Sequence, residues 1–145
     1  NYELATRAPL IVAKPGMKAA GQGTNALVEF VDFYPTLAEL AGLPIPAHVE
    51  GTSFAPLLEN PELSWKKAAF SEMLRQQERL GRSIRTERYR YVEWRGPKGA
   101  LLAKELYDHR SDPEETENLA ERAEYAGTID LLSRQLEAGW KSALP

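Results

Sequence analysis

The hydrophobic pattern changes its period across a proline-rich stretch that runs from Leu43 to Pro61. Before this stretch, Pro9–Ala13 is a continuous apolar run that ends at Lys14-Pro15-Gly16, a pattern typical of a buried parallel strand closed by a turn. We expect the stretch itself to run over the surface as a connector, with one helical turn at Phe54–Leu58. Beyond it, apolar residues alternate with period two, which predicts strands at 68–73, 82–86, 89–94 and 105–107.

Two segments carry helical periodicity. The first begins near Asp32, which we expect to cap the first turn, and ends at Gly42; its apolar residues Phe33, Leu37 and Leu40 share one face. The second spans 122–141, where apolar residues recur at steps of three and four and form one stripe able to cover a sheet face. That stripe consists of Tyr125, Ile129, Leu132, Leu136 and Trp140.

These elements predict an α+β chain in two parts. Residues 1–60 have the character of the last strand and helix of a larger α/β core followed by the connector, and residues 61–145 that of a small four-stranded antiparallel sheet packed by a C-terminal helix. Parallel strands normally have neighbours and are covered on both faces. We therefore expect the first 60 residues to expose apolar surface and to favour self-association of the chain.

Composition narrows the classes of function. With 18 Lys and Arg against 21 Asp and Glu, the net charge of −3 gives no general attraction to nucleic acid or to anionic membranes. The absence of cysteine excludes disulfides, thiolate zinc sites and a cysteine nucleophile. No apolar run approaches the roughly 18 residues that a membrane span requires. Asn1-Tyr2-Glu3 does not open a signal peptide, although an export signal removed earlier is compatible with this start.

Few residues suggest chemistry. His48 and His109 lie far apart in the sequence, and neither has another ligand at metal-binding spacing. No Gly-x-Ser-x-Gly motif of a serine hydrolase occurs. The carboxylate-rich segment 108–117 suggests calcium, but it lacks the glycine and the alternation of an EF-hand loop. We interpret it as a turn at Asp112-Pro113, with Asn118 fixing the chain before the last helix, and expect no metal site.

An arginine-rich pattern surrounds the aromatic residues of the predicted strands. Alternation along a strand would divide these arginines between the two sheet faces, which favours solvated strand edges. A sulfated or phosphorylated sugar is the alternative ligand. The arginines are Arg82, Arg85, Arg88, Arg90 and Arg95.

Several segments of the sequence, taken in order, resemble one family. The segments are Asn1–Ile11, Val31–Gly42, Glu50–Leu58, Ser83–Tyr91 and Glu105–Asp108, followed by Asp112-Pro113 and Asn118-Leu119. They are similar to the C-terminal part of sulfatases of the alkaline-phosphatase superfamily, and within it of iduronate-2-sulfatase-like enzymes. The resemblance extends over nearly the whole chain.

The resemblance implies a calcium-dependent hydrolase of sulfate esters whose nucleophile is a formylglycine made from a Cys/Ser-x-Pro-x-Arg motif. That motif is missing here, since Ser111-Asp112-Pro113-Glu114-Glu115 lacks its arginine and lies at the wrong end of the chain. The resemblance also implies a sulfate-contacting lysine a few positions before Asn1. We expect no catalytic residue in this chain, and an inert fragment whose partner is the missing N-terminal core.

Three basic residues are the first candidates for contacts to a sulfated small molecule or glycan, namely Arg7, Arg75 and Arg85. Structural salt bridges are the competing role for each. Two further functions stay open: a non-catalytic module that binds sulfated glycans, and a fragment of a related phosphoesterase. The family resemblance favours a periplasmic or secreted location.

Overall fold

The computed structural model of the chain describes residues 2–75 and 79–145, which divide into two compact units. One unit combines Asn1–Pro9 with Ala68–Ala143, and the other comprises Leu10–Lys67 with Leu144–Pro145. The predicted division at residue 60 stays a prediction, while the units show that the segment before Leu10 packs with the sheet. No helix in the described residues has the length and apolar character of a membrane span.

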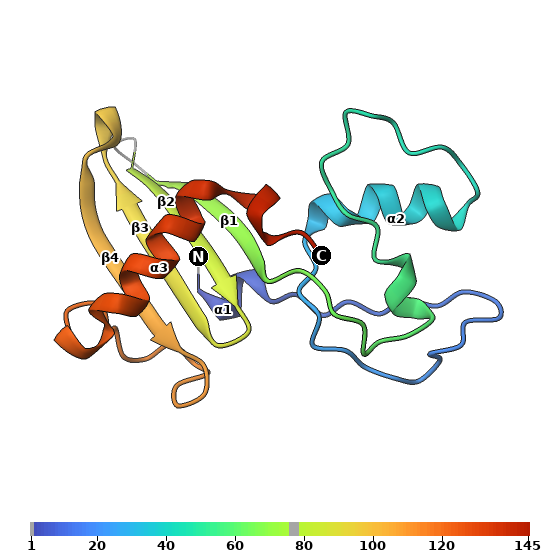
Figure 1. The fold of residues 1–145 in the computed structure, drawn as a ribbon, viewed down its shortest axis with the longest axis horizontal. Coiled ribbons are helices and arrows are strands. Elements are labelled where there is room, and N and C mark those ends of the chain that lie inside the picture. Colours follow the sequence, from blue (N-terminus) through green and yellow to red (C-terminus); the bar gives the residue numbers. More distant parts are fainter. Residues whose placement is uncertain (1, 76–78) are drawn as a thin grey trace. The chain divides into compact units, whose positions relative to one another are not determined.

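The first unit is built on a four-stranded antiparallel sheet in the order β1-β2-β3-β4 (Figure 1). Its cross-strand register aligns Phe70 with Ile84, Ile84 with Tyr91 and Tyr91 with Leu106, so one face carries a continuous apolar row. The predicted antiparallel meander is confirmed. The strands are β1 (Ala68–Arg75), β2 (Arg79–Thr86), β3 (Tyr89–Arg95) and β4 (Leu101–Asp108).

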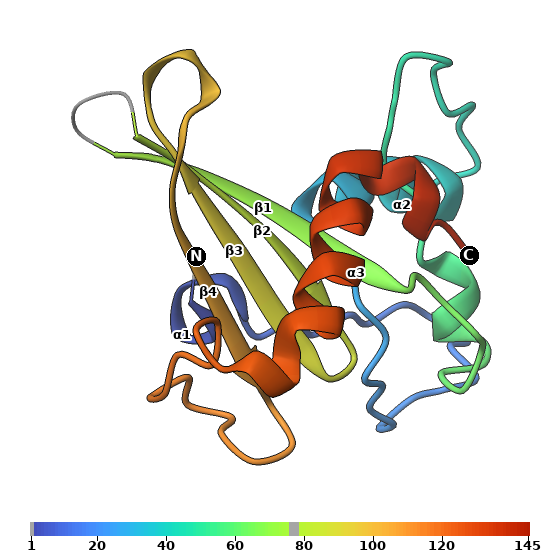
Figure 2. The ribbon, with the colours of Figure 1, turned by 60° about the vertical axis from the view of Figure 1, so that its left-hand side comes forward.

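Helix α3 (Ala126–Ala138) covers this apolar row (Figure 2). Its buried residues Ile129, Leu132 and Leu136 form one hydrophobic cluster with the row. The helix is shorter than the predicted 122–141, because 3₁₀ turns at Ala123–Tyr125 and Trp140–Ala143 flank it. Gly139 ends the helix at φ 76°, a left-handed conformation that glycine adopts without steric cost.

The opposite face of the sheet receives the short helix α1 (Glu3–Thr6), an element that the sequence patterns do not predict. The ring of Tyr2 meets that of Tyr107 edge to face, with the centroids 5.9 Å apart. Arg85 and Arg90, which are paired in the register of β2 and β3, point their side chains to Glu3 on this face. The N-terminal segment is thus held to the sheet by side chains.

The second unit has little regular structure. It contains the 3₁₀ turn η1 (Phe30–Asp32), helix α2 (Phe33–Leu40) and the 3₁₀ turn η2 (Ala55–Leu58), which confirm the predicted helix and helical turn. Residues 9–13, predicted as a strand, form no ladder with any described residue, and Ile11 is 92% exposed. The strand prediction is therefore not met within the described chain, because a strand requires a neighbour with which to exchange main-chain hydrogen bonds.

A buried polar cluster around Asp32 holds the second unit together. The Asp32 carboxylate is fully buried and accepts hydrogen bonds from Lys66 Nζ at 2.7 and 2.8 Å and from the N–H of Glu29 and Thr52 at 2.8 Å. Asp32 thus closes a capping box with Glu29 in η1 and makes no side-chain cap to α2, which corrects its predicted role. We call Asp32, Glu29, Lys66 and Thr52 the Asp32 cluster.

Gly51 allows the loop before η2 to approach η1. A Cβ atom at this position would lie 1.9 Å from the carbonyl oxygen of Val31, a distance that no side chain tolerates. The next residues use the close approach: the N–H of Thr52 reaches Asp32, and that of Phe54 donates to the Thr36 hydroxyl at 2.9 Å. One local packing arrangement is therefore specified by two of the family-like segments, Val31–Gly42 and Glu50–Leu58.

Candidate functional site

Charged side chains from four separate segments converge on the α1 side of the sheet. We call them the Arg90 cluster: Glu3 from α1, Arg85 from β2, Arg90 from β3, and His109 and Glu115 from the segment after β4. Arg90 is only 2% exposed, and the Glu115 side chain only 1%. The cluster brings five ionisable side chains together.

Arg90 is the centre of the cluster. Its Nε donates to Glu115 Oε1 at 2.5 Å, and its Nη2 donates to Glu3 Oε2 at 2.5 Å and to Thr6 Oγ1 at 2.9 Å. Arg85 adds a second guanidinium, with its Nε 3.2 Å from the same Glu3 oxygen. A buried charge is tolerated only when it is paired and hydrogen-bonded, and both conditions hold for Arg90.

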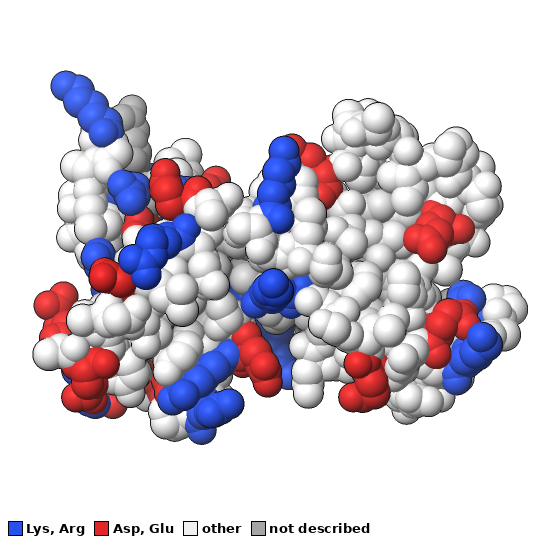
Figure 3. Space-filling view, in the orientation of Figure 1, with Lys and Arg blue, Asp and Glu red and all other residues white. Residues whose placement is uncertain are grey.

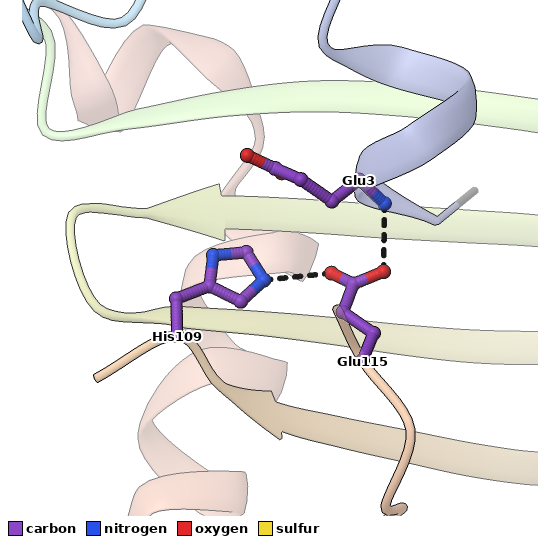
Figure 4. Close-up of side chains that lie close together, drawn as sticks. All are labelled: Glu3, His109 and Glu115. Atoms are coloured by element: carbon purple, nitrogen blue, oxygen red, sulfur yellow. Dashed lines mark hydrogen bonds and ion pairs between the residues drawn. The ribbon is translucent and has the colours of Figure 1, made fainter. Parts of the chain in front are cut away.

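Glu115 connects the cluster to the main chain of α1. One carboxylate oxygen accepts the N–H of Glu3 at 2.6 Å, and the other lies 2.7 Å from His109 Nε2 (Figure 4). Glu115 has φ 57°, a left-handed conformation that non-glycine residues adopt only when their surroundings impose it. The three contacts of its carboxylate and the turn that begins at Asp112 supply that constraint.

The arginines also set the protonation of Glu3. Burial alone would raise the pKa of this carboxyl, but hydrogen bonds and charge from Arg90 and Arg85 outweigh it and hold the pKa of Glu3 below its usual value. Glu3 is therefore ionised at neutral pH. Its charge then offsets part of that of the two guanidinium groups.

The carboxylates of Glu3 and Glu115 and the imidazole of His109 offer ligand atoms within 4.8 Å of one another. Three such groups are a common donor set for a metal ion. Here both carboxylates already accept hydrogen bonds from Arg90, so a divalent cation would have to displace a buried guanidinium. The donor set is therefore better suited to an ion-pair clasp than to a metal, and we derive no chemistry through it.

The structure places the predicted substrate residues in two locations. Arg7 and Arg85 both lie near Glu3, with closest separations of 3.7 and 3.2 Å. Arg75 pairs with Arg79 at the far end of β1, and its guanidinium carbon lies 5.0 Å from the Trp94 ring centroid. Arg85 pairs with Ala69, six residues earlier on β1, so roughly 20 Å of strand separates the two locations. The contacts of Arg7 and Arg85 are the salt bridges that sequence reasoning gave as the competing role.

The five arginines of the arginine-rich pattern also form salt bridges. Each of its members donates to a carboxylate within its own unit, which leaves little unbalanced positive charge on the sheet. The pairs are Arg82 with Glu72, Arg85 with Glu3, Arg88 with Asp108, Arg90 with Glu115 and Arg95 with Glu93.

The carboxylate-rich segment 108–117 forms the predicted turn. Asp112 accepts the N–H of Glu117 at 2.9 Å and the Thr116 hydroxyl at 3.0 Å. The side chain of Asn118 then accepts the N–H groups of Leu106 and Ala120. His109 belongs to the Arg90 cluster, whereas His48 lies exposed in a loop of the other unit.

Comparison with known proteins identifies the chain. The family described as N-sulphoglucosamine sulphohydrolase, C-terminal, matches residues 1–142. This chain belongs to the sulfatase family. The family match confirms that the ordered segments of the sequence are those of a sulfatase C-terminal part.

Curated relatives are also sulfatases. The chain is 32% identical to an N-acetylglucosamine-6-O-sulfatase of Bacteroides thetaiotaomicron over 94% of its own length and 25% of that protein. It is 35% identical to a Delta 4,5-hexuronate-2-O-sulfatase of the same organism, over 86% of this chain and 26% of that protein. It is 31% identical to human arylsulfatase K, over 82% of this chain and 23% of that protein. The chain thus spans about a quarter of the length of the relatives it matches.

Solved structures share the fold. One is a protein in complex with its substrate D-glucosamine-2-N,6-O-disulfate, with a TM-score of 0.64 and 30% identity over 74% of this chain and 22% of that one. Another is a phosphonate monoester hydrolase of Agrobacterium radiobacter, with a TM-score of 0.71 and 28% identity over 86% and 27%. The second likeness supports the alkaline-phosphatase superfamily.

Sequence reasoning did not find the Arg90 cluster or the Asp32 cluster. Glu3 and Arg90 are 87 positions apart, and Asp32 and Lys66 are 34 apart, so no motif of fixed spacing joins them. One weak signal was available: Arg90 shares its face of the strand with the apolar residues Val92 and Trp94, which is unusual for a solvated arginine.

Proposed function

We propose that this chain is the C-terminal part of a sulfuric ester hydrolase whose catalytic groups reside in a separate core. The observation that carries the proposal is the family match over residues 1–142, together with relatives of which the chain spans only about a quarter. In this proposal the chain shapes and supports the enzyme. The missing core is its partner.

Cleavage of a sulfate ester requires a strong nucleophile and fixed positive charge directed at the developing negative oxygens. The sequence has no cysteine, and its nearest approach to a formylglycine motif ends at Glu115, whose carboxylate is committed to Arg90. The converging carboxylates are neutralised by arginines and do not suit calcium. Formylglycine and calcium therefore belong to the proposed full-length enzyme, and no step here involves them.

The substrate that we propose is a sulfated sugar or a small sulfate ester. The names of two relatives specify sulfated sugars, and one solved relative holds a disulfated glucosamine. Arg75 is the strongest candidate for a substrate contact among the three arginines, because no carboxylate in the described residues pairs with it. In the complete enzyme, Arg75→Ala should raise KM for a sulfated sugar, whereas Arg7→Ala should leave KM within about twofold.

The test of the proposal is a comparison of the purified chain with the complete enzyme that carries it. With calcium present, the chain alone should release no detectable 4-nitrophenol from 4-nitrophenyl sulfate, and the complete enzyme should turn it over. Turnover by the chain alone would refute the assignment of the chemistry to the core. An inactive complete enzyme would refute the sulfatase proposal itself.

A related phosphoesterase is the second candidate, favoured by the likeness to phosphonate monoester hydrolase over 86% of the chain. Assaying the complete enzyme with aryl sulfate, aryl phosphate and aryl phosphonate in parallel distinguishes the two. A non-catalytic glycan module is less well supported, because the arginines of the sheet are already paired with carboxylates. Micromolar binding of heparin fragments by the isolated chain, lost in Arg85→Ala, would restore that alternative.

A further inference from the structure

A pocket of about 240 Å³ lies on the α3 side of the sheet unit. Its walls come from β1, β2 and the C-terminal end of α3, and every residue that lines it belongs to the first unit. Phe70, Leu136 and Trp140 form its apolar part, and Glu72 and Arg82 form its charged part. An engineered cavity of roughly 150 Å³ holds a benzene molecule, so this pocket has room for one six-membered ring with small substituents.

The break between α3 and the 3₁₀ turn η5 (Trp140–Ala143) creates the pocket. Gly139 ends the helix in a left-handed conformation, and open space surrounds the position where its side chain would begin. Ala143, at the far end of the turn, is anchored in the hydrophobic cluster of the sheet unit, whereas Trp140 lines the pocket. Trp140 thus continues the apolar stripe of α3 in the sequence, but its ring stays half-buried at the pocket.

The charged part of the pocket is fixed in position by Arg82. Its Nε donates to Glu72 Oε1 at 3.1 Å, and its Nη2 donates to the carbonyl oxygen of Leu136 at 3.4 Å. Its Nη1 lies 3.5 Å from Glu137 Oε2. These contacts engage three of the five N–H groups of a guanidinium. Within the described residues, the other two N–H groups of Arg82 and the second carboxylate oxygen of Glu72 are available to a ligand.

The surroundings favour an uncharged ligand that both donates and accepts hydrogen bonds. A purely apolar ring would cover the Arg82–Glu72 pair without supplying hydrogen bonds, which costs free energy. A sulfate or phosphate group would meet the carboxylate of Glu72. In Figure 3 acidic and basic side chains are intermixed over the sheet unit, so no large patch of positive charge attracts an anion. A hydroxylated ring suits both members of the pair, because each hydroxyl is a donor and an acceptor.

We propose that this pocket binds one uncharged pyranose ring of a glycan. The C–H face of the ring packs on Trp140, because the face of an aromatic ring carries partial negative charge that attracts C–H groups. The hydroxyl groups of the sugar bond to Arg82 and Glu72. A glycan that is also held elsewhere on the enzyme gains affinity from this contact through effective concentration. The choice of a sugar rests on the proposed function, in which the substrate is a sulfated sugar.

The test titrates the chain with chitotriose and with cellotriose, two uncharged trisaccharides, and follows the indole N–H signals of its three tryptophans by NMR. Only the Trp140 signal should shift, with a Kd on the order of 1 mM. Trp140→Leu and Glu72→Ala should each weaken binding at least about fivefold, because each removes one side of the contact. The Glu72 side chain is 61% exposed, so Glu72→Ala keeps the fold even where Trp140→Leu does not.

Trp65→Leu and Glu87→Ala are the matched controls. Trp65 is half-buried like Trp140 but belongs to the second unit, and Glu87 is exposed between β2 and β3. Both controls should bind within about twofold of the wild-type chain. No binding of either trisaccharide, or equal losses in the controls, would overturn the inference.

Two further outcomes are informative. Binding of phenol at Trp140 without binding of either trisaccharide would assign the pocket to an apolar ring and overturn the inference as well. Trisaccharide binding at Trp140, in a chain whose complete protein cleaves no sulfate ester, would leave the sugar site standing and refute only the proposed function.

Discussion

Removing the guanidinium of Arg90 should destabilise the sheet unit far more than removing an exposed arginine. In Arg90→Met the methionine keeps most of the side-chain volume, so the change is mainly the loss of charge and of three hydrogen bonds. The Glu115 carboxylate, 1% exposed, then stays buried without its cationic partner. Breaking a buried ion pair in this way typically costs about 3–5 kcal/mol of folding free energy.

The structure places the expected value near the lower end of that range. Glu115 retains the N–H of Glu3 and the contact with His109, and Glu3 is exposed enough to regain water. We expect a loss of about 3 kcal/mol, which corresponds to an approximately 150-fold larger opening equilibrium. Hydrogen exchange of β3 peptides, measured where reclosing is faster than exchange, should accelerate by that factor.

Arg122→Met is the matched control. Arg122 pairs with Glu117, but both side chains are about half exposed, and such pairs contribute about 0–1 kcal/mol. Hydrogen exchange of the same β3 peptides in Arg122→Met should accelerate by less than about fivefold. Adding Glu115→Gln to Arg90→Met should recover part of the loss, because the buried group is then neutral, with a coupling of about 1–3 kcal/mol. Equal effects of the two arginine variants, or strict additivity with Glu115→Gln, would refute the reasoning.

Three further predictions concern the packing and charge of the two units. Gly51→Ala forces a Cβ atom onto a main-chain oxygen and should destabilise the second unit by at least about 2 kcal/mol in urea denaturation, whereas Gly127→Ala, with open space on α3, should be neutral or slightly stabilising. Lys66→Met should cost about 3 kcal/mol by leaving Asp32 buried without its cation, and Asp32→Asn in that background should recover part of the loss; no recovery would contradict the pairing. The pKa of Glu3 is lowered from 4.5 in the folded chain, so the contribution of Glu3 to stability is complete above pH 4.5 and is lost as the pH falls through the folded pKa. Glu3→Gln should therefore flatten the acid limb of a plot of unfolding free energy against pH. An unchanged acid limb would rule this out.

The fold of the sheet unit was predictable because its signals are local. Alternation of period two and a stripe at steps of three and four report directly on which side chains face a common core, so the four strands and α3 follow from short windows. The ends of α3 were misplaced because Trp140 continues the stripe while Gly139 breaks the helix. Strand β4 begins at Leu101, four residues before its predicted start, because Leu101 and Leu102 are both exposed and do not alternate.

The sequence by itself determined the family, the antiparallel sheet with its covering helix, and the absence of a Cys/Ser-x-Pro-x-Arg motif from these residues, since each of these is a matter of residue type and local spacing. Only the tertiary structure decided which charges meet. Arg90 looks like its neighbouring arginines in the sequence, yet it alone is buried, because α1 and the segment after β4 close over it from positions 87 and 25 residues away. Ion pairs over such separations depend on how whole elements pack, and a charged residue carries no local mark of its partner.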